Sequence, residues 1–131
     1  MQPRPRADEL LATVGEVLER DLVPALTGPA QHHARVAANL VGIVERELRL
    51  GPAAQAREVE VLRGLLGPRA TSDDSSGDDD VVALRTRLAA ELRSGMADDP
   101  ARAAEIWPAL MELVRADLSI SKPGHDSWEG E

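Results

Sequence analysis

The sequence predicts an all-α fold, an up-and-down bundle of four to five helices with one disordered acidic loop. Three observations lead to this prediction. Aliphatic residues recur at spacings of three and four in several stretches, which is the period of a helix with one apolar face. No stretch shows the apolar–polar alternation of a strand. Phe and Tyr are absent, so the core must be built from Leu, Val, Ile and Ala, which suit helix-on-helix packing.

Length and composition limit the classes of protein that fit. The 131 residues predict one domain, 1–131, with one hydrophobic core. A formal net charge of −8 argues against binding to nucleic acid or to an anionic membrane. No Cys is present, which excludes disulfides, thiolate metal sites and a thiol nucleophile. Since there is no apolar signal-peptide segment and no long apolar run, we expect a cytoplasmic protein that spans no membrane.

The first predicted helix covers residues 8–26 and follows a loose arm at 1–6. Pro24 should kink this helix or end its regular part, because proline removes a helical hydrogen bond. Asp21 falls within the apolar face, so we expect it to be a buried polar anchor that has a partner. The apolar face consists of Leu10, Leu11, Val14, Val17, Leu18 and Leu22.

The longest periodic run predicts a second helix at residues 29–50, which Gly51 and Pro52 should end. Within its apolar face stand His33 and Glu47, which each need a partner if they are buried. They are fourteen residues apart, roughly 21 Å along the helix, so they cannot pair within one chain. Two hypotheses stay open: both are structural anchors, or they line a ligand pocket. The apolar face consists of Val36, Ala37, Leu40, Ile43, Val44 and Leu48.

One edge of the same helix carries a row of mostly polar residues, which we call the arginine strip. Its cationic groups could hold an anionic ligand or an acidic partner surface, and its glycine would allow close approach. A solvated surface is the alternative interpretation in an Arg-rich protein. The strip supplies candidate ligand- or partner-binding residues in addition to the two in the apolar face. It consists of His32, Arg35, Asn39, Gly42, Arg46 and Arg49.

A third helix at residues 52–66 should end at Gly67, and an acidic Ser/Gly-rich loop at 69–80 follows it. Aspartate-rich loops suggest calcium binding. This loop lacks the order of ligands, the central Gly and the closing Glu of an EF-hand, so we interpret it as a solvated, disordered linker.

A fourth helix at residues 80–94 and a fifth at 99–121 complete the predicted bundle, and a disordered tail at 123–131 follows. Asp117 falls within the apolar arc of the fifth helix and is predicted to be a second buried polar anchor. The fourth stripe contains Val81, Leu84, Leu88 and Leu92, and the fifth contains Ala103, Trp107, Leu110, Val114 and Leu118.

The sequence lacks the motifs of the common catalytic and metal sites. Carboxylate-bridged metal sites in bundles use Glu-x-x-His pairs, and none is present. A phosphate-binding loop and a G-x-S-x-G nucleophile elbow are also missing. A dyad of His33 with Asp21 or Asp117 is geometrically possible, but such pairs are more often structural. We therefore predict no catalytic residues, no metal and no cofactor.

Residues 4–26 and 33–52 resemble an uncharacterised bacterial domain family, a domain of unknown function. Five positions of the second helix match its pattern: His33, Arg35, Asn39, Glu45 and Glu47. The resemblance covers residues 4–67 and extends more loosely over 110–123, where relatives carry Lys in place of Asp117 and Asn-Pro in place of Lys122-Pro123.

Members of that family are encoded beside aminoglycoside-phosphotransferase-like kinases and acyl-CoA dehydrogenases. The resemblance implies an accessory protein that works with one of these neighbours, with a role in acyl-CoA metabolism. Since no catalytic constellation is present, we predict that this accessory protein is non-catalytic. Two alternatives remain. One is a small-molecule binder or enzyme with a pocket around His33 and Glu47, and the other is a homodimeric structural helical protein.

Overall fold

A computed structural model of the chain describes residues 3–67 and 77–125, the latter without the side chains of 77–79. Every regular element in these two ranges is a helix, which confirms the predicted all-α class. The structure assigns no helix to residues 3–6, in agreement with the predicted arm.

Parts of the predicted irregular segments lie outside the described residues, namely 1–2 of the arm, 69–76 of the acidic loop and 126–131 of the tail. The last four positions of the predicted loop, 77–80, are helical instead. Aspartates stabilise the start of a helix because they interact with its positive end, which accounts for the longer helix.

The chain divides into two compact units. Unit 1 contains the described residues up to Pro52 together with Ile120–Pro123, and unit 2 contains Ala53–Ser119 with residues 124–125. That residues 1–131 form one domain stays a prediction.

Unit 1 begins with α1 (Ala7–Val17), which continues into the π-helical turn η1 (Leu18–Leu22) and the short α2 (Val23–Ala25). The wide π turn ends at Leu22, two residues before Pro24, whose nitrogen cannot donate to a carbonyl four residues earlier. The predicted extent of the first helix and its irregularity at this proline are therefore confirmed.

α3 (Gly28–Leu66) has 39 residues and continues through Pro52, so the predicted helix end at Gly51 and Pro52 was wrong. Gly51 does not take a positive φ. A proline removes one hydrogen bond, and the good helix formers on both sides outweigh that loss. The helix ends instead at Gly67, which has φ 78° and donates its N–H to the carbonyl of Arg63 at 2.9 Å.

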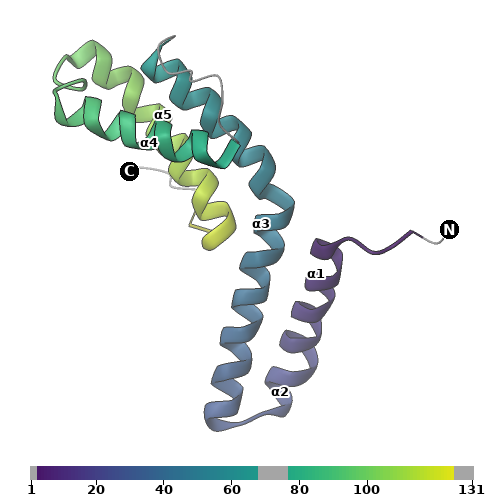
Figure 1. The fold of residues 1–131 in the computed structure, drawn as a ribbon. Helices are drawn as coiled ribbons and strands as arrows, with labels where there is room; N and C mark the ends of the chain where they lie inside the picture. Colours follow the sequence, from purple (N-terminus) through teal and green to yellow (C-terminus); the bar gives the residue numbers. More distant parts are fainter. Residues whose placement is uncertain (1–2, 68–76, 126–131) are drawn as a thin grey trace. The chain divides into compact units, whose positions relative to one another are not determined.

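In unit 1, α1 lies antiparallel beside the first part of α3 (Figure 1). The contact uses small residues: a Cβ added to Gly15 would lie 3.6 Å from Cγ1 of Val41, and Ala34 and Ala38 on that side of α3 are buried. Gln31 also donates its Nε2 to the carbonyl of Val23 at 3.0 Å. The side of α3 that packs is therefore not the side with the large aliphatic residues.

Eight large aliphatic side chains of unit 1 remain between 39% and 55% exposed, so their predicted burial is wrong for the single chain. In each helix the centre of this set lies roughly 110° from the packed side, in the same rotational sense along the chain. Because the two helices are antiparallel, the two sets face the same side of the helix pair. We call these eight residues the apolar face of unit 1: Leu10, Val14, Val17, Leu22, Val36, Leu40, Val44 and Leu48.

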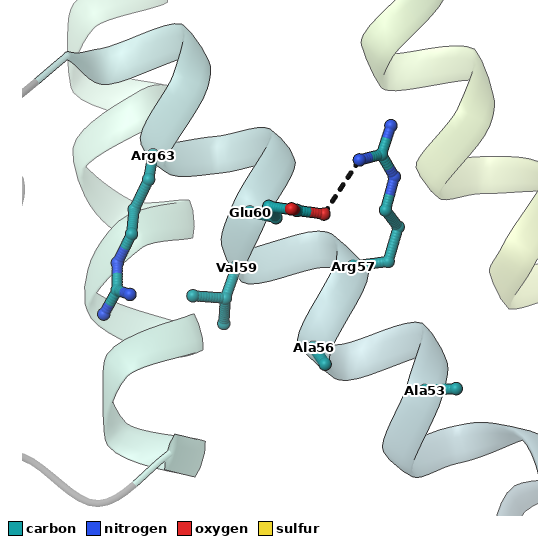
Figure 2. A pocket seen from close by; sticks show the side chains of 6 residues that line it. All are labelled: Ala53, Ala56, Arg57, Val59, Glu60 and Arg63. Atoms are coloured by element: carbon teal, nitrogen blue, oxygen red, sulfur yellow. Dashed lines mark hydrogen bonds and ion pairs between the residues drawn. The ribbon is translucent and has the colours of Figure 1, made fainter.

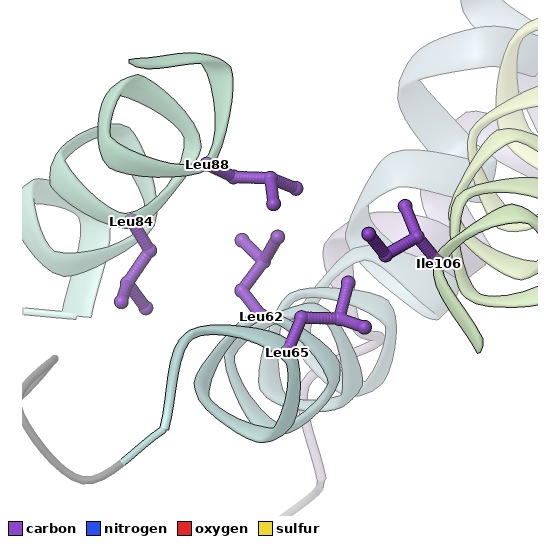
Figure 3. Close-up of a cluster of buried hydrophobic side chains, with 5 residues drawn as sticks. All are labelled: Leu62, Leu65, Leu84, Leu88 and Ile106. Atoms are coloured by element: carbon purple, nitrogen blue, oxygen red, sulfur yellow. The ribbon is translucent and has the colours of Figure 1, made fainter. Parts of the chain in front are cut away.

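Unit 2 contains the second part of α3 together with α4 (Gly77–Arg93) and α5 (Pro100–Ser121). Its core brings one apolar stripe from each helix together, and Leu62 at its centre is 1% exposed (Figure 3). The stripe predicted for the fourth helix is confirmed. On α5 the structure buries Ile106 and exposes Trp107 and Val114, so the predicted stripe was wrong at these two positions. Leu110 of that stripe does pack against the core. The buried cluster consists of Leu62, Leu65, Leu84, Leu88 and Ile106.

Candidate functional site

The arginine strip of α3 is partly occupied by contacts within unit 1. Arg46 donates its Nε to the carbonyl oxygen of Ile120 at 2.7 Å, in the last turn of α5. Arg49 donates its Nε to Glu45 at 2.8 Å. This hydrogen bond, followed by the charge of Glu45, raises the pKa of Arg49. These two guanidinium groups therefore already have acceptors within the protein.

Gly42 was expected to allow a ligand to approach the strip closely. The group that approaches it is the guanidinium of Arg46, because a Cβ added at Gly42 would lie 3.0 Å from Nη1 of that side chain. His32, Arg35 and Asn39 are exposed along the same helix. The strip thus leaves these three side chains accessible to a ligand or partner.

His33 and Glu47 are both exposed, so neither is a buried anchor in the single chain. The rings of His32 and His33 have centroids 6.1 Å apart. The Glu47 carboxylate folds back over Gly51, with Oε1 2.8 Å from the place a Cβ on that glycine would take. The physical reason is that α1 packs on the neighbouring side of α3 and leaves this side uncovered.

The predicted burial of Asp21 and Asp117 is wrong as well, since both are exposed. Asp21 accepts a hydrogen bond from Nε of Arg20 at 3.2 Å. The pKa of Arg85 is raised mainly by its hydrogen bond to Glu58, and the charge of Asp117 adds to that rise. In the part of the chain with described side chains, no polar or charged residue is buried.

Unit 2 has a shallow hollow along α3 that sequence reasoning missed (Figure 2). The charges at its rim pair with each other: Arg57 donates to Glu60 at 2.9 Å and to Glu112 of α5 at 2.6 Å. The sequence feature that could have indicated this hollow is a pair of alanines, three residues apart, beside charged residues. The lining residues are Ala53, Ala56, Arg57, Val59, Glu60 and Arg63.

Three further polar contacts join the helices of unit 2. Nη2 of Arg85 on α4 donates to Glu58 at 2.8 Å, and Nη2 of Arg63 donates to Asp80 at 3.4 Å. Arg102 donates to the carbonyl of Leu65 at the end of α3, where backbone carbonyls lack helical partners. These contacts give several charged residues of unit 2 a structural role.

Two surfaces with exposed apolar side chains remain as candidates for binding. One is the apolar face of unit 1. The other is on α5 in unit 2, where Trp107 is 63% exposed and Val114, two turns further on, is 50% exposed. Trp is enriched among the residues that dominate the energy of protein interfaces. Both surfaces suit a protein partner better than a small polar ligand.

Over residues 3–67 and 80–125, no group of three His, Asp or Glu side chains could hold a metal ion. No helix within the described ranges is long and apolar enough to cross a membrane.

A family model described as a domain of unknown function, DUF6285, matches residues 24–125 of the chain. Neither a curated protein nor a solved structure matches it. The matched range begins in α2 and includes α3, α4 and α5.

Proposed function

Because the chain belongs to the DUF6285 family, whose description assigns no activity, we propose that it is a non-catalytic accessory protein that acts by binding another protein. The observation that supports this proposal is the exposed Trp107 on α5, with Val114 on the same side of the helix. Trp is enriched at the centre of protein interfaces, where the surrounding contacts exclude water.

The partner we propose is a phosphotransferase-like kinase or an acyl-CoA dehydrogenase, and the role we propose is in acyl-CoA metabolism. Support for this choice comes from the genomic neighbourhood that the family resemblance implies. The accessible part of the arginine strip, with His32, Arg35 and Asn39, offers a second contact for an acidic partner surface.

The test is light scattering after size exclusion, with the chain alone and mixed with an enzyme of each of these two classes. We expect one mixture to give a stable complex. Trp107→Ala should weaken that complex at least about tenfold, as truncation of a central interface Trp does. Val82→Ala is the matched control, because Val82 on α4 is 61% exposed and lies outside this surface.

Two results would overturn the proposal. One is turnover of a kinase or acyl-CoA substrate by the purified chain alone. The other is a complex whose affinity Trp107→Ala leaves unchanged.

A further inference from the structure

The apolar face of unit 1 is a contiguous exposed surface with the features of an interaction site. Its eight Leu and Val side chains are each 39% to 55% exposed and lie on one side of a helix pair. Together they amount to apolar surface on the order of several hundred Å², an extent that marks interaction sites in soluble proteins. A helix pair of this kind is one half of a four-helix bundle.

The residues of α3 on this side are arranged symmetrically about Leu40. Val36 and Val44 each lie four residues from Leu40, roughly 6 Å along the axis. His33 and Glu47 each lie seven residues away, roughly 10 Å along the axis. An imidazole thus stands at one end of the row and a carboxylate at the other, with Leu and Val between them.

We propose that the apolar face is covered by the same face of a second copy, with the two α3 helices antiparallel and Leu40 on the two-fold axis. In such an isologous interface, each residue contacts the residue at the mirrored distance in the other copy. Val36 packs against the partner's Val44. His33 meets the partner's Glu47, and the same pair forms again at the other end. The carboxylate accepts a hydrogen bond from the imidazole N–H.

The residues of α1 fit the same axis. Because Gly15 contacts Val41, Glu16 lies at about the level of Leu40. Leu10 and Leu22 lie six residues on either side of Glu16, so the axis that relates the two α3 helices also brings Leu10 to the partner's Leu22. The two rows of the apolar face therefore share one centre.

The other face-to-face arrangement would pack α3 on the partner's α1, with the two-fold axis parallel to the helices. Because α1 is antiparallel to α3 and Gly15 lies beside Val41, Glu9 lies at about the level of Glu47. Packing of that kind would place Glu47 at the level of the partner's Glu9, which lies off the apolar face and whose carboxylate accepts the backbone N–H of Arg6. Glu47 would find no hydrogen-bond donor there, whereas the arrangement about Leu40 gives two His–Glu pairs.

A single engineered cysteine tests the register, since the chain has no Cys of its own. In the proposed dimer the two copies of position 40 face each other, so Leu40→Cys should form an intersubunit disulfide under mild oxidation. Val36→Cys is the matched control on the same face. Its two copies would lie eight residues apart along the axis, roughly 12 Å, which is too far for a disulfide.

A charge swap tests the His–Glu pairs. His33→Glu should raise the dimer dissociation constant at least about tenfold, because it places two carboxylates opposite each other at both ends. His33→Glu combined with Glu47→Arg should restore the dimer, since it rebuilds both pairs with reversed sign. His32→Glu is the control: His32 is also exposed on α3 but points about 100° away.

Several results would overturn this inference. They are a monomer at high concentration, a dimer in which Leu40→Cys forms no disulfide, and a swap that fails to restore the dimer. The double variant keeps the test informative if His33→Glu merely unfolds unit 1, because Glu47→Arg would not rescue a folding defect. The outcome is independent of binding at Trp107, which lies in unit 2.

Discussion

The guanidinium of Arg46 donates its Nε to the carbonyl oxygen of Ile120 at 2.7 Å, and these residues are 74 positions apart in the sequence. Ile120 is buried and belongs to the last turn of α5, where carbonyls have no helical N–H partner. A residue that the sequence placed among the candidate ligand-binding residues thus caps a helix end within unit 1.

Loss of this cap should destabilise unit 1. We expect Arg46→Gln to lower the free energy of unfolding by about 1–2 kcal/mol, because a charged donor to a half-buried carbonyl is removed. Arg35→Gln is the matched control: Arg35 is exposed on the same helix, and its replacement should change stability by less than about 0.5 kcal/mol. Urea denaturation of both variants checks the prediction. Equal losses of unfolding free energy in the two variants would contradict it.

The core of unit 2 should depend strongly on Leu62, which is 1% exposed at the centre of three helices. Leu62→Ala should cost about 2–5 kcal/mol, because it removes buried apolar surface and leaves a cavity. Val82→Ala removes a side chain of α4 that is 61% exposed and should cost less than about 0.5 kcal/mol. Thermal unfolding followed by circular dichroism compares the two. A similar unfolding temperature for both variants would show that the core of unit 2 does not depend on Leu62.

Two glycines near the end of α3 should respond in opposite ways to alanine. A Cβ at Gly64 meets nothing within 4 Å, and the backbone there is helical, so Gly64→Ala should stabilise the protein by about 0.5–1 kcal/mol. Gly67 also has open space but has φ 78°, so Gly67→Ala should destabilise by about 1 kcal/mol or more. The denaturant midpoints of both variants check this prediction. A change of stability in the same direction for both would be evidence that α3 does not end at Gly67.

The ion pair between Arg57 and Glu112 predicts a dependence of stability on acid. The pKa of Glu112 is lowered, first by the hydrogen bond from Arg57 and then by the charge of Arg57. A lowered folded-state pKa contributes stability above the ordinary pKa of glutamate, and that contribution is lost as pH falls through the lowered value. Both side chains are about half exposed, so solvent screening makes the contribution small.

Unfolding midpoints of the wild type and Glu112→Gln between pH 7 and pH 3 measure this contribution. The wild type should be more stable at pH 7, and the difference should shrink in the acidic part of the range. If the stability difference between the wild type and Glu112→Gln grew as the pH falls, it would contradict a lowered pKa of Glu112.

The sequence predicted the helical class and most helix ends, because periodic aliphatic residues and turn-forming glycines are local signals. It failed at Pro52, where the helix formers on both sides outweigh one missing hydrogen bond. It also failed on α5, where Ile106 is buried in place of Trp107. Which side of that helix packs depends on α3 and α4, and a stripe read from α5 alone does not contain this information.

The candidate residues His33 and Glu47 illustrate a further limit. Their positions in an apolar stripe predicted burial within the chain, but His33, Glu47 and most of the large residues of the stripe are exposed. In the structure Ala34 and Ala38 take the buried positions beside α1, because small residues let two helices approach closely. The large aliphatic residues are then left to a contact that one copy of the chain does not supply.

The dimer is tested most directly by the mass of the wild-type protein alone in solution, measured by light scattering across a range of concentrations. We expect a particle of two chains, each of 14.1 kDa, that dissociates only on dilution. A mass of one chain at every concentration, with the helices intact by circular dichroism, would contradict it.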